Sequence, residues 1–585
     1  MPVFVREKVV PVGETRQTYV QIVENERVGE QVKQRVVCSL GNRKNLDPAA
    51  VDRLVMSLAR YGTVVPVPRP TTTADLGDAD PGLGTRGDRH FGDFFVLDQI
   101  WRDFGLRSLL RRYGNDRRFK FDLERAAFAM VASRLIEPKS KLATETWLDQ
   151  RAHFPHATLF THEQFYNTLL WLNDVKGEIE VDLHRHLKRR RLTGARVYFY
   201  DTTLTHFDGE GPASLAQVTG RKGARGGKRH VLVGVVTTSD GWPVMTHVFP
   251  GATNDAKTFK ATLRELYDRF GLREIVIICD RGMRSKKVIK LLEAKDGYDY
   301  GYIVATKLRR QGVITKNVLK RAGRYHKVED GLDVKEVWVG KQRYVVCRNQ
   351  ESAVRDTNRR AEIVAQLEEK IGTGLDPATK AAMKLRTKAH ARYLKIRDDR
   401  LVIDREAVEK DARYDGKWVL QSNLPELDPG KIALRYKDEA RIERSMRTLK
   451  TFLRLRPVFH HGEEWVNGHV FVCALALLMY RALQERLGSW PASRESIEQH
   501  LALLGTIRAT EHRVGHENEQ PQYLWTRSDL TPEQHDLLRR LAVKKLPRVL
   551  GPPPRLSDAD RARSTERRER RRKPPRAGVS PDMAV

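Results

Sequence analysis

The first pattern along the chain is an alternation of apolar and polar residues over 3–40, as in TYVQIVENERVGEQVKQRVVCSL. A period of two is typical of strands with one buried face, so this segment predicts a small antiparallel meander. A short helix is expected over 49–61. The next stretch, VVPVPRPTTTADLGDADPGLGTRGD, is rich in Pro, Gly, Thr and Asp and predicts a linker or long loop.

From about 93 to 190 the apolar residues recur at steps of three and four, which is the period of a helix. The pattern is seen in LDQIWRDFGLRSLLRRYG, in LERAAFAMVASRLIE and in EQFYNTLLWLNDVKGEIEVDLHRHLKRR. Many arginines and lysines stand between these apolar positions. We therefore expect a helical region with strongly basic surfaces.

The period changes again at Ala195. RVYFY predicts a compact strand that ends at Asp201, and KRHVLVGVVTTSDGWPVMTHVF predicts a hairpin. DAKTFKATLRELYDRFG reads as an amphipathic helix, and EIVIIC as an apolar strand that ends at Asp280. A further helix over 285–292 and the strand YGYIVATK complete the order β-β-β-α-β-α-β. That order is expected of a ribonuclease-H-like core with a mixed sheet.

Residues 311–434 break this rhythm. Short strands, VKEVWVG and QRYVVC, precede charged helical stretches over 351–372 and 377–397, and KWVLQSNL predicts another strand. The block looks inserted into the core, and two helices over 436–456 and 464–487 return to it. The predicted fold class is α/β, or more fully an α+β multidomain chain with a ribonuclease-H-like core, a β-rich and helical insertion, and an N-terminal helical region.

Eight segments follow from these changes of pattern. They are a meander plus helix (1–62), a linker (63–92), a helical region (93–194), the first part of the catalytic core (195–310), the insertion subdomain (311–434), the second part of the core (435–490), a C-terminal helical region (491–555) and a basic disordered tail (556–585).

The net charge of the chain limits the classes of molecule that it is expected to bind. It has 106 Lys and Arg against 75 Asp and Glu, a net charge of +31. Such an excess points to a polyanion, most often nucleic acid. An anionic membrane surface is the competing partner, but no basic amphipathic anchor stands beside an apolar stretch. The helical region 93–194 either grips DNA or packs as a domain with a solvated basic face, and the tail adds non-specific attraction to phosphates.

Four cysteines lie far apart and form no CxxC pair. This spacing argues against a structural zinc site and a disulfide framework, and it fits a reducing cytosol. The start, MPVFVREKVV, is too charged for a signal peptide. The longest apolar run, Val470 to Tyr480, is short for a membrane span, so it predicts a buried core helix.

Carboxylates at the predicted strand ends are the first candidates for chemistry. Cutting a phosphodiester requires charge stabilisation on the attacking and leaving oxygens, which two divalent ions supply. Magnesium prefers oxygen ligands. Asp201 and Asp280 each read equally well as a turn aspartate when taken alone. Their strands are expected to be parallel neighbours, so both carboxylates emerge at one edge of the sheet, where ligands bind.

Glu443 is the third candidate, in LRYKDEARIERSMRTLKTFLRLRP. Tyr436, Glu443 and Lys450 are spaced by seven, which places them near one face of a single helix. The alternative is an ordinary solvated helix with balanced charges.

Three motifs together resemble the insertion-sequence DDE transposases, in the branch with a long β-rich insertion before the third acid. In that family the first acid follows a strand, as in YFYDTT, and the second stands in a turn such as IICDRGM. The third lies in a helical signature of Tyr, Arg, Glu and Lys, whose spacing Tyr436, Glu443 and Lys450 fit. Glu439 stands where the family has arginine. The likeness runs from about 195 to 487.

The resemblance implies two Mg²⁺ or Mn²⁺ ions, with Asp201 bridging both and Asp280 and Glu443 each completing one site. It implies cleavage of double-stranded DNA at terminal inverted repeats and attack of the freed 3′ hydroxyl on target DNA. Tyr436 and Lys450 would hold the phosphate near the scissile bond. A homodimer acting in the bacterial cytoplasm, at the nucleoid, is expected.

A basic glycine-rich loop, TGRKGARGGKRH, is a further candidate for DNA contact. It is not a nucleotide-binding P-loop, because Arg229 stands where that motif needs Ser or Thr. The alternative is a solvated charge run. The residues predicted to contact DNA here and in the DRGM turn are Arg221, Lys222, Arg225, Lys228 and Arg281.

Aromatic and histidine residues carry weaker hypotheses. Trp338 and Trp418 either stack on an unpaired base or lie in the core. His460, His461 and His469 read better as satisfied helix histidines than as ligands of a transition metal. Two other functions stay open: a transposase-derived DNA-binding protein without catalysis, and another ribonuclease-H-like nuclease.

Overall fold

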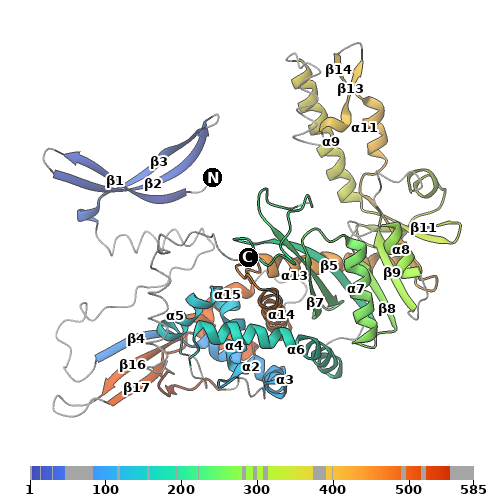
Figure 1. Ribbon diagram of the computed structural model, residues 1–585. Helices are drawn as coiled ribbons and strands as arrows, with labels where there is room; N and C mark the ends of the chain where they lie inside the picture. Colours follow the sequence, from blue (N-terminus) through green and yellow to red (C-terminus); the bar gives the residue numbers. More distant parts are fainter. Residues whose placement is uncertain are drawn as a thin grey trace, which may run out of the picture. The chain divides into compact units, whose positions relative to one another are not determined.

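A computed structural model shows how the chain folds (Figure 1). It divides the chain into two compact units, Met1–Leu83 and Gly84–Val585, and each is described by itself. The residues that the structure describes are 3–12, 15–28, 31–46, 84–114, 119–153, 159–190, 196–221, 223–279, 285–293, 299–306, 308, 314–372, 390–397, 400–488, 496–514, 522–543 and 545–553.

The first unit contains the predicted meander. Its strands are β1 (Val3–Val12), β2 (Thr15–Val28) and β3 (Gln31–Asn42), joined antiparallel in the order β1-β2-β3. The alternation over 3–40 is therefore confirmed as a strand pattern. The helix expected over 49–61 lies outside the described residues.

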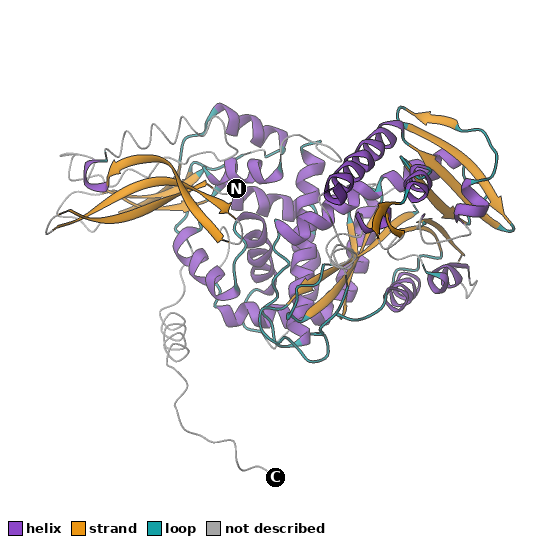
Figure 2. Cartoon of the chain, turned by 90° about the horizontal axis from the view of Figure 1, so that it is seen from above, coloured by secondary structure: helices purple, strands orange, loops and turns teal. Residues whose placement is uncertain are grey.

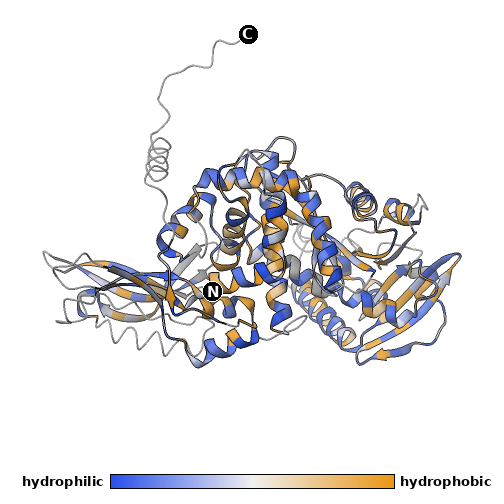
Figure 3. Cartoon of the chain, turned by 90° about the horizontal axis from the view of Figure 1, so that it is seen from below, coloured by the Kyte–Doolittle hydropathy of each residue, from blue (hydrophilic) through white to orange (hydrophobic). Residues whose placement is uncertain are grey.

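The second unit begins with the predicted helices. They are α2 (Gly92–Asp103), α3 (Leu106–Tyr113), α4 (Leu123–Ile136), α5 (Lys141–Arg151) and α6 (His162–Arg189). Thr161 starts α6 with a capping box, in which its hydroxyl accepts from the backbone N–H of Gln164 and the Gln164 side chain bonds back. Figure 3 shows hydrophilic and hydrophobic residues side by side along the helices at the surface, whereas α4 is buried from Leu123 to Leu135.

The core follows the predicted order. Its elements are β5 (Val197–His206), β6 (His230–Thr238), β7 (Pro243–Pro250), α7 (Asp255–Asp268), β8 (Glu274–Cys279), α8 (Lys286–Glu293) and β9 (Asp299–Ala305). The sheet order is β7-β6-β5-β8-β9, with β5, β8 and β9 parallel and the other pairs antiparallel. This is the mixed sheet of a ribonuclease-H-like core, so the predicted fold class is confirmed.

One strand boundary differs from the prediction. β5 does not end at Asp201 but continues to His206. Within the described residues its parallel pairing with β8 runs as far as Tyr200 and Cys279, and its antiparallel pairing with β6 continues to His206. The hydrogen bonds to β6 are enough to extend the strand past Asp201.

The insertion extends the core sheet instead of forming a separate one. β10 (His326–Glu329), β11 (Leu332–Val339), β12 (Gln342–Arg348) and β15 (Lys417–Ser422) continue it in the order β10-β11-β12-β15-β9, giving nine strands in all. Residues 311–434 are thus only partly a subdomain apart from the core. The part that stands away from the sheet is the arm, made of α9 (Gln350–Gly372), β13 (Leu394–Arg397), β14 (Arg400–Ile403) and α11 (Arg405–Ala412) (Figure 1).

The arm corrects one further prediction. The helix expected over 377–397 is described only from residue 390, where a 3-10 turn, His390–Tyr393, leads into β13. Leu394 is buried against Val364 and Leu367 of α9, so tertiary packing overrides the charged, helix-like sequence there.

The predicted helix over 436–456 is two helices, α12 (Pro429–Lys437) and α13 (Glu439–Thr451). The two helices meet at Asp438, which keeps right-handed helical dihedrals and whose N–H donates to the carbonyl of Leu434 at 3.3 Å. Tyr436 therefore lies on α12, whereas Glu443 and Lys450 lie on α13. The single helix assumed for these three residues is two consecutive helices, and their common face stays a prediction.

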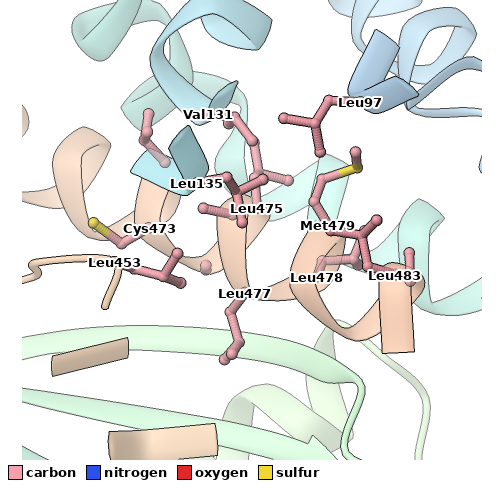
Figure 4. Close-up of a cluster of buried hydrophobic side chains, with 14 of the residues drawn as sticks. Leu97, Val131, Leu135, Leu453, Cys473, Leu475, Leu477, Leu478, Met479 and Leu483 are labelled. Carbon is pink, nitrogen blue, oxygen red and sulfur yellow. The ribbon is translucent and has the colours of Figure 1, made fainter. Parts of the chain in front are cut away.

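The apolar run predicted as a core helix lies in α14 (Glu463–Arg486), which packs against α4, α6 and β7. Figure 4 shows Leu475, Leu477 and Met479 of this helix within a buried cluster. Among the described residues, α14 is the one helix long and apolar enough to cross a membrane, and 89% of its apolar window is buried inside the protein. A Cβ at Gly468 would lie 2.3 Å from the carbonyl oxygen of Leu169, so glycine permits the close approach of α14 to α6.

A second sheet was missed by the sequence pattern. β4 (Gly84–His90) lies in the predicted linker, and β16 (Arg508–Val514), β17 (Gln522–Arg527) and β18 (Val549–Leu550) lie in the predicted C-terminal helical region. They pair in the order β18-β17-β16-β4, beside α15 (Ile497–Gly505) and α16 (Pro532–Arg540). Figure 1 shows the four-stranded sheet and the nine-stranded sheet on opposite sides of the helices α2, α4 and α6, and Figure 2 shows the helices and strands of the chain from above. β4 is polar and becomes a strand through its pairing with β16.

Candidate active site

Asp201 lies on the face of the core sheet that α13 and α14 cover. Side chains alternate along β5, so Asp201 shares the face of Val197 and Phe199. Both of these belong to the same buried cluster as Leu449 of α13. Asp201 is half-buried, and one of its carboxylate oxygens accepts from the backbone N–H of Thr202 at 2.7 Å.

The opposite face of β5 is a closed core. Tyr198 and Tyr200 pack there with Phe259 of α7, and burial raises the pKa of the Tyr200 phenol to about 12. This face of β5 is therefore packed as core, and none of the predicted acidic residues within the described ranges lies on it.

Asp280 follows β8 directly along the chain, and it lies outside the described residues, as do Arg281 and Lys222. The pairing register of β8 with β5 supports an expectation about its position. Tyr200 and Cys279 are paired in the parallel ladder, and Asp201 and Asp280 are the residues that come next in each strand's sequence. The proximity of the two carboxylates stays a prediction that rests on this register.

Glu443 lies on α13, which contacts β5. The helix is anchored by Leu449, which is buried, while Glu443 is exposed. α13 thus brings an exposed carboxylate to the same side of the sheet as Asp201. Tyr436 and Lys450 are both half-buried, and Tyr436 packs against the main core.

The residues present suit a hard divalent cation. All three candidates are carboxylates, and oxygen ligands are those that magnesium and manganese take. Within the described ranges no three His, Cys, Asp or Glu side chains gather as a metal site. Because Asp280 falls outside those ranges, the predicted triad is not tested by that result.

The basic loop lies at the far end of β5, near His206. His206 is five positions after Asp201, which is about 17 Å along a strand. The Arg221 guanidinium bonds to the carbonyl of Thr253 and to Asp255. Lys228 pairs with Asp208 at 3.0 Å. These two charges are therefore partly neutralised within the protein.

Arg225 takes part in a histidine pair beneath the loop. Its backbone N–H donates to Nε2 of His230 at 3.0 Å, and its guanidinium lies 3.4 Å from Nε2 of His206. Burial, and next the charge of Arg225, lower the pKa of His206. The prediction that Arg225 contacts DNA remains open, because its guanidinium points at a neutral imidazole and not at an acid.

Two arginines were missed by the sequence reading. Arg444 and Arg447 are exposed on α13, one and four positions after Glu443, and neither has a hydrogen bond or ion pair with any described residue. Their nearness to Glu443 was visible in the sequence. The signal overlooked was that Arg447, four positions after Glu443, lies on the same helix face, whereas Arg444 points about 100° away from it around the helix.

The hypotheses for the two tryptophans and for the histidines have different outcomes in the structure. Trp338 is 41% exposed and so remains accessible to a base, whereas Trp418 packs partly buried against the core. His460 and His469 are buried, with ring centroids 5.2 Å apart. His460 precedes α14, and the buried Nδ1 of His469 has no hydrogen-bond partner among the described residues. The prediction of helix histidines is therefore wrong for His460, which lies outside the helix, whereas His469 does lie on α14 and its Nε2 is 3.9 Å from the Sγ of Cys473.

Two family models match parts of this chain. Residues 193–479 match the family model described as a transposase DDE domain, and residues 8–66 match the N-terminal domain of IS1634 family transposases. Together the two matches cover more than half of the chain. No curated protein matches it.

Two solved structures show a distant likeness. A piggyBac transposase synaptic complex with hairpin DNA has 11% identity and a TM-score of 0.35, covering 72% of this chain and 82% of that one. A Mos1 transposase paired-end complex has 12% identity and a TM-score of 0.14, covering 32% and 59%.

Proposed function

Because the chain belongs to the insertion-sequence DDE transposases, we propose that it cuts double-stranded DNA at the ends of its element and joins the freed 3′ ends to target DNA. The carboxylates of Asp201, Asp280 and Glu443 are the groups proposed to hold two Mg²⁺ or Mn²⁺ ions. The observation that carries this assignment is the sheet register. The parallel pairing of β5 with β8 aligns Tyr200 with Cys279, the residues that immediately precede the two aspartates, and α13 contacts β5.

The ions, when bound, supply the positive charge that stabilises the attacking and leaving oxygens of an in-line phosphoryl transfer. The chain's own part is to hold three carboxylates at fixed positions. Asp201 is fixed because β5 is hydrogen-bonded to β6 along its whole length. Glu443 is fixed because Leu449 of the same helix and Leu453, just after its end, are buried in the core. No protein nucleophile is needed.

The test is cleavage of labelled DNA that carries the inverted repeats flanking the gene. We expect cutting with Mg²⁺ or Mn²⁺, none with a chelator, and binding without cutting in Ca²⁺. Binding with no cutting in any divalent cation would contradict the proposal and favour a transposase-derived DNA-binding protein. Cutting without joining to target DNA would favour another ribonuclease-H-like nuclease.

Arg444 and Arg447 are proposed to bind the phosphates that flank the scissile bond. They are exposed beside Glu443, and no described residue neutralises them. We expect the double variant Arg444→Ala, Arg447→Ala to weaken DNA binding. The slope of log affinity against log salt should fall by about two, since each phosphate contact contributes roughly 0.9. The measurement is a salt titration of end-DNA binding in Ca²⁺.

The matched control removes two exposed cations from the other sheet face, as Lys260→Ala with Arg264→Ala on α7. This variant should keep the parent's salt slope. An equal fall for both double variants would mean that the loss reflects net charge alone, and the assignment of Arg444 and Arg447 would be wrong.

Synapsis of two DNA ends implies that the chain acts as a homodimer on DNA, in the bacterial cytoplasm. Light scattering of the protein with and without end DNA measures the number of protein chains in the complex and so tests the homodimer. A complex with one protein chain on two DNA ends would contradict it.

A further inference from the structure

The segment that follows α13 contains a strained residue. Arg454 has a φ of 46°, in the left-handed region that residues other than glycine rarely adopt. Such a conformation costs free energy and persists only when surrounding contacts impose it. The contacts of Arg454 therefore indicate what holds the segment in place.

Both ends of the segment are tied to other elements. On one side Arg134 of α4 donates to the carbonyl of Arg454 at 3.3 Å, and also to the carbonyl of Lys139 at 3.1 Å. On the other side the N–H of Val458 donates to the carbonyl of His206 at 3.0 Å. The segment is thus a bridge from α4 to the end of β5, the strand that carries Asp201.

The same segment closes the end of α13. The N–H of Leu453 donates to the carbonyl of Thr448 at 3.0 Å, and that of Leu455 to the carbonyl of Leu449 at 3.1 Å. Figure 4 shows Leu453 in the same buried cluster as Leu135, the neighbour of Arg134 on α4. A shift of Arg454 would therefore be transmitted to α13 and to Glu443.

The burial of the Arg134 side chain costs free energy of folding. It is only 8% exposed and forms no ion pair with a carboxylate among the described residues. Lys141, also buried, interacts with it unfavourably, and burial is the main cause that lowers the pKa of both side chains, that of Lys141 to about 7. Buried cations without counter-charges destabilise a fold. Among the described residues, the guanidinium of Arg134 donates its hydrogen bonds to the carbonyls of Lys139 and Arg454. Holding these two carbonyls in place is therefore what the buried arginine contributes to the fold.

We propose that Arg134 is a positioning residue that holds the left-handed turn at Arg454 and thereby sets the helix of Glu443 against β5. The inference rests on the proposed role of Glu443 as a metal ligand. It names a contact between the helical body and the catalytic core through which the third carboxylate is placed.

The experiment measures Mn²⁺ binding to the protein–DNA complex by electron paramagnetic resonance, for the parent and for Arg134→Gln. We expect the variant to bind Mn²⁺ roughly tenfold more weakly, as is typical when a group that orients a ligand is lost. Its affinity for end DNA in Ca²⁺ should equal that of the parent. The matched control is Arg89→Gln, because Arg89 also donates to two carbonyls, those of Asp149 and Ala152, at another place in the fold.

A second substitution separates positioning from general stability. Glycine adopts a positive φ without strain, so Arg454→Gly should restore most of the Mn²⁺ affinity lost in Arg134→Gln. A merely stabilising role for Arg134 predicts no such rescue. Unchanged Mn²⁺ binding in Arg134→Gln, an equal loss in Arg89→Gln, or no rescue would each overturn the inference.

Failure of the proposed function would look different. If Glu443→Gln binds Mn²⁺ as tightly as the parent, Glu443 is not a ligand and the proposed metal site itself is wrong. If Glu443→Gln loses Mn²⁺ and Arg134→Gln does not, only the positioning role is wrong.

Discussion

Asp201→Asn, Asp280→Asn and Glu443→Gln should each reduce cleavage of end DNA at saturating Mg²⁺ by at least about 100-fold, the usual lower range for losing one preorganised charge-stabilising group. Each change keeps the size of the side chain and removes its negative charge. The three carboxylates are proposed to act as one site, so the losses should not add in a double variant. The measurement is single-turnover cleavage of labelled DNA, with binding in Ca²⁺ recorded beside it.

Asp208→Asn is the control for these variants. Asp208 lies just past the end of β5, where it pairs with Lys228 well away from Asp201. It should cut at the parent's rate. A triad variant that also cuts at the parent's rate would remove that residue from the site, and Glu443 is the one to test first because its assignment depends on spacing and on the contact of α13 with β5.

Arg125→Met should lower the free energy of unfolding by about 3–5 kcal/mol, the range for breaking a buried ion pair. Arg125 is fully buried on α4, and its guanidinium bonds to the buried carboxylates of Asp98 and Glu124. Glu124 also accepts from the indole N–H of Trp101 at 2.8 Å. Methionine fills the space but leaves two carboxylates without a buried cation. Urea unfolding followed by tryptophan fluorescence measures the loss.

The control for Arg125 is Arg264→Met, which breaks an exposed pair with Asp268. Exposed pairs contribute little, so its unfolding midpoint should match the parent's. A midpoint for Arg125→Met equal to that of the parent would show that the buried network is not a source of stability.

Much of the core could be predicted because each of its elements carries its own period. The strand EIVIIC and the helix after Asp255 are regular enough to be recognised locally, and their order fixes the topology. β4 could not be found in this way, because GTRGDRH is polar and becomes a strand only by pairing with β16, more than 400 residues later. The break at Asp438 was missed for a similar reason, since the sequence around it suits a helix throughout.

The candidate site could likewise be predicted only in part from the sequence. The acids were found from their places after strands and in a helical motif, and the register of β5 with β8 agrees with the pairing assumed for the first two. Asp280 itself stays a prediction. Arg134 could not be found from the sequence, because its role depends on two carbonyls brought to it by the fold. An arginine in a largely apolar helix carries no such signal.

The nine-stranded sheet has a mechanical consequence. β15 is hydrogen-bonded to β9, and β9 to β8, the strand that leads to Asp280. Hydrogen-bonded strands resist sliding, because a slip of one residue would turn every side chain to the other face. The strands of the insertion therefore keep a fixed register with the strand that leads to Asp280, and their movement relative to β8 and β9 would require breaking sheet hydrogen bonds.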